Sequence, residues 1–205
     1  MAILLLCMLM LASSCNGSDP AKGTGEPDPP DLPPGEVPMW SYRIVNAWPH
    51  DTSAYTQGLV YTDGVFLEGT GGGTRLRSRN LVSSLRRVSI ETGLVQQQVT
   101  LDEQFFGEGI TLLHGRVYQL TWRSRVGFIY DLDGLTPLGS FDYAASDTTG
   151  WGLTHDGESL WMSDGSAFLS RRSPEDFREL GRIEVTHKDK PVRALNELEW
   201  VQGEI

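Results

Sequence analysis

Four positions in this sequence carry side chains whose types could form a binding or catalytic site. Gln57, Glu108, Trp151 and Asn196 each stand two residues before an aliphatic residue in one of four similar stretches. These stretches read QGLVYTDGVFLEGTG, EGITLLHGRVYQLTW, WGLTHDGESLWMSDG and NELEWVQGEI. Structural repetition alone would keep the position alike, but it holds an amide, a carboxylate, an indole and another amide. A carboxylate can exchange protons and an amide can bind a carbonyl group, so the mixture predicts a functional site.

The spacing of the stretches indicates how the chain brings these side chains together. The aligned aliphatic residues recur at separations of 51, 43 and 45 residues, as expected of structural repeats; they are Leu59, Ile110, Leu153 and Leu198. Between successive stretches lie two further strand-like runs, and no segment from Tyr42 onward keeps a helical apolar period. Four antiparallel strands per repeat predict an all-β fold of the β-propeller type. An open solenoid is the alternative.

In a propeller the first strand of each blade lines the central channel, so equivalent positions converge near the axis. We therefore expect Glu108 to be the acidic member of a ring of inward-facing residues, with a glycine on either side allowing a tight turn. Trp122, at the end of the next strand, should return to the same face. The alternative is that these residues only satisfy backbone groups in loops, a task to which tryptophan is poorly suited. We interpret Glu68 as a solvated strand end and Asp164 as part of a turn.

The composition limits the classes of protein to which the chain can belong. With 205 residues, 39% of them hydrophobic, it can bury the core of one globular domain. A net charge of -10 argues against a nucleic-acid partner, because there is no basic stripe to displace counterions. Neutral or cationic partners fit such a surface.

The first 38 residues differ from the rest of the chain. Residues 1–15, MAILLLCMLMLASSC, form an apolar run that ends in small residues before Cys15, as in a bacterial lipoprotein signal with lipid on the Cys15 sulfur. The run is short for a membrane-spanning helix. Residues 16–38 hold seven of the eleven prolines and predict an extended acidic tether.

From this division we expect the folded domain to occupy residues 39–205. The protein is predicted to be exported and anchored in the bacterial cell envelope on the periplasmic side, and to touch the membrane only through its lipid. A cytosolic protein with an apolar N-terminus is the alternative.

Several longer motifs resemble a known enzyme family. At FGEGITLLHGRVYQLTW, together with YTQGL, SSLRRVSIETG, GFIYDLD, GWGLTHDG, MSDGS and LNELEWVQGEI, the chain resembles glutaminyl-peptide cyclotransferases of the plant and bacterial type. The motifs occur in order from about Tyr42 to Ile205. The resemblance implies a five-bladed β-propeller, of which this chain covers about three and a half blades. It also implies an aminoacyltransferase that converts the N-terminal glutamine of peptides or proteins into pyroglutamate and releases ammonia.

The resemblance assigns roles to individual residues. It implies Glu108, in FGEG, as the catalytic general acid and base. It implies that substrate is bound by the amides and aromatic side chains of the channel, namely Gln57, Asn196, Trp122, Trp151 and Tyr55. Tyr55 stands where the family usually has phenylalanine, so its hydroxyl is an added group at the rim of the pocket.

The end of the sequence departs from the family pattern. The family continues past NELEWVQGEI with another tryptophan and a lysine near the site, and its N-terminal strand, here YRIVNAW, closes the ring against the last blade. We expect the present chain to be truncated inside the fourth blade. An unpartnered edge of this kind favours aggregation, whereas the complete protein is expected to be a monomer.

The chemistry of cyclisation needs proton transfer, and no cofactor is expected. A peptide α-amine has a pKa of roughly 7.7 to 8.0, so a carboxylate that takes its proton makes it nucleophilic and can then protonate the departing ammonia. Partial burial among aromatic residues would raise the pKa of Glu108 into the working range. The four histidines have no metal-ligand spacing. The alternatives are a non-catalytic propeller that binds a peptide or glycan, and an inactive truncated product.

Overall fold

The computed structural model describes residues 41–72, 81–143 and 149–205, and these form strands and turns without a helix. The compact unit of the chain begins at Trp48 and ends at Ile205. The predicted signal (1–15) and tether (16–38) lie outside the described residues. Within the described ranges no helix has the length and apolar character needed to cross a membrane.

The segment YRIVNAW, residues 42–48, is not assigned as a strand. An extended segment becomes part of a sheet only when a neighbouring strand satisfies its backbone groups. Residues 42–48 belong to none of the sheets in the structure.

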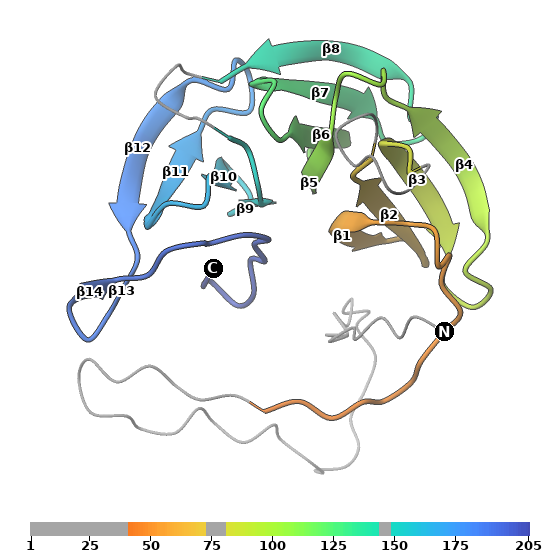
Figure 1. Cartoon of the computed structure of the whole chain (residues 1–205), viewed down its shortest axis with the longest axis horizontal. Coiled ribbons are helices and arrows are strands. Elements are labelled where there is room, and N and C mark those ends of the chain that lie inside the picture. Colours follow the sequence, from red (N-terminus) through yellow and green to blue (C-terminus); the bar gives the residue numbers. More distant parts are fainter. Residues whose placement is uncertain (1–40, 73–80, 144–148) are drawn as a thin grey trace, which may run out of the picture. The chain divides into compact units, whose positions relative to one another are not determined.

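Three four-stranded antiparallel sheets make up the compact unit, and each follows chain order (Figure 1). The first sheet consists of β1 (Thr56–Thr62), β2 (Val65–Thr70), β3 (Ser84–Ser89) and β4 (Val95–Thr100). The second consists of β5 (Gly107–Leu113), β6 (Arg116–Thr121), β7 (Val126–Asp131) and β8 (Pro137–Asp142). The third consists of β9 (Leu153–His155), β10 (Leu160–Ser163), β11 (Phe168–Arg172) and β12 (Glu179–Glu184). The prediction of four antiparallel strands per repeat is therefore confirmed for three repeats.

The sheets are arranged like propeller blades around a common centre. In each, the first strand lies innermost and the fourth lies at the rim, so that β1, β5 and β9 face the same central region (Figure 1). The fold is all-β and propeller-like, and we call each four-stranded sheet a blade.

The fourth repeat is only partly formed among the described residues. A short hairpin of β13 (Thr186–His187) and β14 (Lys190–Pro191) follows the third blade. The stretch NELEWVQGEI then runs without a strand assignment, and only the bridge between Val201 and Glu204 forms. Gln202 and Gly203 make the turn of that bridge with positive φ angles of 51° and 90°.

Hairpin turns fix the register of the innermost strand pairs. Asp63 and Gly64 connect β1 to β2, and His114 and Gly115 connect β5 to β6. All four have positive φ angles, between 45° and 79°. Two successive residues in this conformation give the tight turn whose twist matches that of paired strands, which explains the Asp-Gly and His-Gly signals in the sequence.

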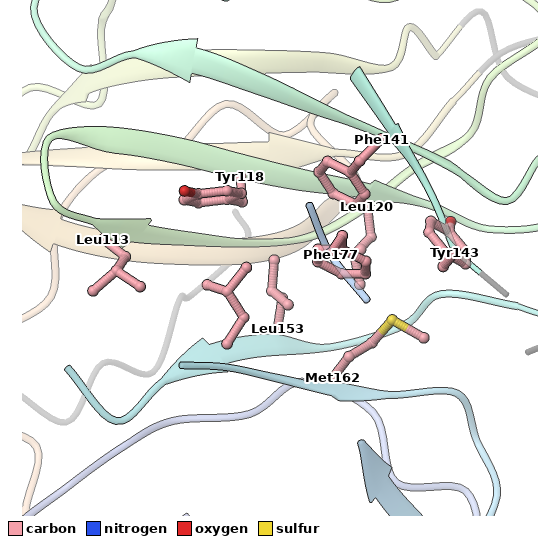
Figure 2. Close-up of a cluster of buried hydrophobic side chains, with 9 residues drawn as sticks. Leu113, Tyr118, Leu120, Phe141, Tyr143, Leu153, Met162 and Phe177 are labelled. Carbon is pink, nitrogen blue, oxygen red and sulfur yellow. The ribbon is translucent and has the colours of Figure 1, made fainter. Parts of the chain in front are cut away.

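The core consists of two apolar clusters, one at each interface between neighbouring blades. Between the first and second blades pack Leu67, Leu85, Ile110, Val117, Tyr130 and Leu135. Between the second and third pack Leu113, Tyr118, Leu120, Phe141, Tyr143, Leu153, Leu160, Met162 and Phe177 (Figure 2). The rings of Phe141 and Phe177 stack with centroids 3.9 Å apart. The two faces of each interface come from neighbouring blades. Displacing the inner strand of one blade therefore exposes apolar surface on the blade next to it.

Candidate active site

Glycines let the inner strands of successive blades approach each other at the centre. One glycine directly precedes the aligned aliphatic residue in each of the first three repeats; these are Gly58, Gly109 and Gly152. A Cβ atom at any of them would lie 2.5 Å or less from a backbone atom of the next repeat. Such contacts essentially never occur, so only glycine permits this approach. The residues before these glycines, Gln57, Glu108 and Trp151, are thereby held on adjoining inner segments, and the backbone of Asn196 lies against Gly152.

β-Bulges set the direction of two of these side chains. The register of β1 against β2 shifts between Thr56 and Gly58, and that of β5 against β6 shifts between Gly107 and Ile110. Gln57 and Glu108 therefore each lie in a bulge, a feature that often re-aims a side chain beside a functional site. The bulge at Glu108 also leaves the backbone amide of Gly109 outside the pairing of β5 with β6. Gly109 N instead donates to Trp151 O of the third blade at 2.8 Å.

The carboxyl group of Glu108 is buried and unpaired. The residue is 7% exposed, and its side chain makes no hydrogen bond or ion pair within the described part of the chain. Removal from water raises the pKa of Glu108 from 4.5 to about 8. Burial therefore shifts the pKa of this group towards the neutral range, the direction expected from the sequence.

The indole of Trp151, whose backbone pairs with Gly109, presents a second unsatisfied group. Its Nε1 is buried and has no hydrogen-bond partner in the described structure. A Cβ atom at Gly165 would lie 2.9 Å from the indole ring, so the ring lies flush against that turn. A buried donor without a partner costs free energy, and a bound ligand that supplies an acceptor recovers it.

The side chains of Tyr55, Phe106 and Trp122 form an aromatic wall. Phe106 lies two residues before Glu108 in the sequence. Trp122 N donates to Phe106 O at 2.9 Å, and the two rings lie 5.8 Å apart between centroids. Tyr55 meets Phe106 edge-on at 6.2 Å and is 46% exposed, which agrees with a position at the rim. The sequence reasoning missed Phe106, although the pair of phenylalanines before Gly107 was a visible signal.

The backbone of Asn196 connects the fourth repeat to the third blade. Its carbonyl oxygen accepts a hydrogen bond from Ser163 Oγ at 2.6 Å, and Ser163 Oγ in turn accepts one from Gly152 N at 2.8 Å. The residue itself is exposed. The third blade thus anchors the fourth repeat beside Trp151, and the role of the Asn196 amide stays a prediction.

Two further carboxyl groups near the centre were not singled out from the sequence. Glu197 stands at the position that glycine holds in the other three repeats. Although much of the residue is exposed, removal of its carboxyl from water raises its pKa, and the charges of Glu199 and Glu108 raise it further. Burial also raises the pKa of Glu199. A cationic group beside Glu197 would also interact with the carboxyls of Glu199 and Glu108. The sequence signal for Glu197 was the replacement of the glycine found in the other three repeats.

Glu68 corrects one interpretation made from the sequence. It is 1% exposed rather than solvated. His50 Nε2 lies 2.8 Å from Glu68 Oε1, and Thr56 Oγ1 donates to the same oxygen at 2.6 Å. The strand end is buried because residues 50–56 fold over it. Asp164 does lie in a turn, as expected, where its Oδ1 accepts from Ser166 N at 2.9 Å.

The residues that could ligate a metal do not gather into a site. Within residues 41–72, 81–143 and 149–205 there is no group of three or more histidine, cysteine, aspartate or glutamate side chains placed to hold a metal ion.

Sheets arranged as blades, with a buried carboxyl where their inner strands meet, define a propeller-like protein with a candidate site at the centre. The WD40 repeats of RRP9 share the fold, with a TM-score of 0.51 at 11% identity over 72% of this chain and 42% of that one. Residues 8–205 match the family model for glutamine cyclotransferase, and the chain belongs to this family.

Two relatives are similar enough to compare in detail. A glutaminyl-peptide cyclotransferase of Arabidopsis thaliana is 38% identical over 165 residues, covering 80% of this chain and 48% of the plant protein. The crystal structure of Myxococcus xanthus glutaminyl cyclase superposes with a TM-score of 0.67 at 31% identity, covering 78% of this chain and 64% of that one. The chain therefore spans about half the length of its plant relative.

Proposed function

We propose that this chain carries the catalytic centre of a glutaminyl-peptide cyclotransferase, which converts an N-terminal glutamine into pyroglutamate and releases ammonia. The observation that carries the proposal is the buried, unpaired carboxyl of Glu108, whose pKa of about 8 lies in the range of a peptide α-amine. Family membership and the names of both relatives support it.

The reaction needs one group that moves a proton twice. The α-nitrogen of the glutamine forms a bond to its own side-chain amide carbon, and Glu108 takes the proton that this nitrogen loses. The bond from that carbon to the amide nitrogen then breaks, and Glu108 returns the proton so that ammonia leaves. Because the two pKa values are close, each transfer costs little free energy, which is the condition for efficient general acid–base catalysis.

The remaining residues of the site bind and orient the substrate. The rings of Trp122 and Phe106 offer an apolar wall for the glutamine methylenes. The unsatisfied Nε1 of Trp151 donates to the amide oxygen as negative charge develops on it. Gln57 and Asn196 supply further polar contacts, and the carboxyls of Glu197 and Glu199 attract the α-ammonium group.

Turnover of a defined peptide tests the proposal. The purified chain is incubated with a peptide that begins with glutamine, and the loss of one ammonia per peptide is followed by mass spectrometry and by an ammonia assay. The matched control is the same peptide with an acetylated N-terminus, which lacks the nucleophile. Binding of the glutamine peptide without ammonia release would favour the non-catalytic propeller instead.

The rate should rise with pH and level off above about pH 8. The reaction starts from a free amine and an ionised Glu108, and below this pH both hold a proton, so neither the nucleophile nor the proton acceptor is present. We expect kcat/KM, measured from pH 6 to pH 10, to rise more steeply than a single ionisation allows and then to reach a plateau. A profile that follows the ionisation of the substrate amine alone would contradict this role for Glu108.

We also propose that the protein is exported and anchored through lipid on Cys15, with residues 16–38 as the tether. The proposal rests on the apolar run that ends at this cysteine. In a bacterial host the full chain should partition with membranes and carry an added lipid mass, and Cys15→Ser should abolish both. A chain that stays in the soluble fraction with its N-terminal methionine intact would overturn the proposal.

A further inference from the structure

We propose that Arg123 is a specificity-determining residue of the site and binds an acidic side chain at the second position of the substrate peptide. This inference rests on the proposed cyclotransferase function, because it assumes that the glutamine enters beside Glu108. The ligand chemistry is a peptide carboxylate, from glutamate or aspartate directly after the N-terminal glutamine.

Arg123 lies at the outer end of the aromatic wall. Burial decreases outward from Glu108, which is 7% exposed, through Trp122, which is half-buried, to Arg123, which is exposed. Trp122 is fixed to the start of β5 by the hydrogen bond from its N to Phe106 O. A substrate whose first residue contacts Trp122 has its second residue roughly 3.5 Å further along the chain, within reach of the Arg123 side chain stacked on the same ring.

The guanidinium of Arg123 is held in place but has no anionic partner. It lies 3.9 Å from the centroid of the Trp122 ring, within the range of a cation–π contact. It makes no hydrogen bond or ion pair in the part of the chain that the structure describes. Other arginines there do pair with carboxylates, among them Arg86, Arg171, Arg172, Arg178 and Arg182.

This combination suits carboxylate recognition. The chain is strongly acidic, with a net charge of -10, so an arginine that remains unpaired keeps all its donors for a ligand. Stacking on Trp122 limits the rotamers of Arg123, which lowers the entropy lost when it binds.

The test compares three peptides that differ only at the second residue, Gln-Glu, Gln-Ala and Gln-Lys, with the same remaining sequence. The quantity measured is the ratio of kcat/KM for Gln-Glu to that for Gln-Lys. We expect Arg123→Gln to lower this ratio by about fivefold and Arg123→Glu to lower it further, whereas Arg123→Lys should retain part of it. Raising the salt concentration should reduce the difference between wild type and Arg123→Gln.

Arg116→Gln provides the matched control. Arg116 is an exposed arginine at the opposite end of β6, roughly 20 Å from Trp122 at about 3.3 Å per residue, and its replacement changes the net charge equally. Its ratio should equal that of wild type. An unchanged ratio in Arg123→Gln and Arg123→Glu, or an equal change in Arg116→Gln, would refute the role of Arg123 while leaving the proposed function intact. If none of the peptides is cyclised by wild type, the proposed function itself fails.

Discussion

Replacing Glu108 with glutamine is expected to lower kcat/KM on a glutamine-initiated peptide by about 10² to 10⁴, the usual value of general acid–base catalysis. Glutamine keeps the size of the side chain but cannot accept the proton of the α-amine or return it to the leaving group. The part of the pH dependence assigned to Glu108 should disappear with it, so that only the ionisation of the substrate amine remains. The measurement is kcat/KM for wild type and Glu108→Gln on the same peptide.

The same substitution should not destabilise the fold, which separates loss of chemistry from unfolding. Burial raises the pKa of Glu108 from 4.5 to about 8. Between these pH values the folded protein holds a proton that the unfolded chain has lost, so stability falls as pH rises and is fully reduced above pH 8. At about 1.36 kcal/mol per pKa unit, ionised Glu108 costs up to roughly 5 kcal/mol. Glu108→Gln should therefore melt no lower than wild type at pH 8.

A surface variant completes the comparison. Glu91→Gln removes the same charge at an exposed position in the turn between β3 and β4. It should keep both the activity and the melting temperature of wild type. Turnover by Glu108→Gln within a few-fold of wild type would remove this residue from the mechanism. A melting temperature well below wild type would instead show that the carboxylate has a partner essential to the fold.

The architecture of the blades was predictable because it depends on local signals. Period-2 runs ending at Asp-Gly and His-Gly pairs dictate hairpins, since these residues accept positive φ angles. The repeat spacing then places the inner segments of successive repeats side by side, and Gly109 N does donate to Trp151 O. The burial of Glu108 also followed from the surrounding apolar residues.

Features that depend on long-range contacts were not predictable in the same way. Glu68 was interpreted as solvated because the sequence does not reveal that residues 50–56 return to cover it. The bulges that contain Gln57 and Glu108 follow from strand registers, which are visible only once both strands are paired. YRIVNAW has the composition of a strand, but composition does not supply the neighbour that a strand requires.

Gly109→Ala should cause a large loss of stability. The added Cβ would lie 2.5 Å from Trp151 O and 2.8 Å from Leu153 N, so the second and third blades would have to separate. That movement breaks the hydrogen bond from Gly109 N to Trp151 O and loosens the apolar cluster between the blades. We expect a cost of about 3 kcal/mol or more, which corresponds to a fall of roughly 6 to 12 °C in melting temperature.

Gly139→Ala isolates the effect of the close approach from the general effect of replacing glycine. Gly139 is an exposed residue of β8, and a Cβ there meets nothing within 4 Å. Its replacement should leave stability unchanged or raise it slightly, because alanine restricts the unfolded chain. Equal melting temperatures for the two variants would show that the inner strands do not meet at Gly109. If Gly109→Ala alone is destabilised, the close approach of Gly109 to Trp151 holds the second and third blades together. If this variant also loses activity at temperatures where it remains folded, the same contact positions the residues of the site.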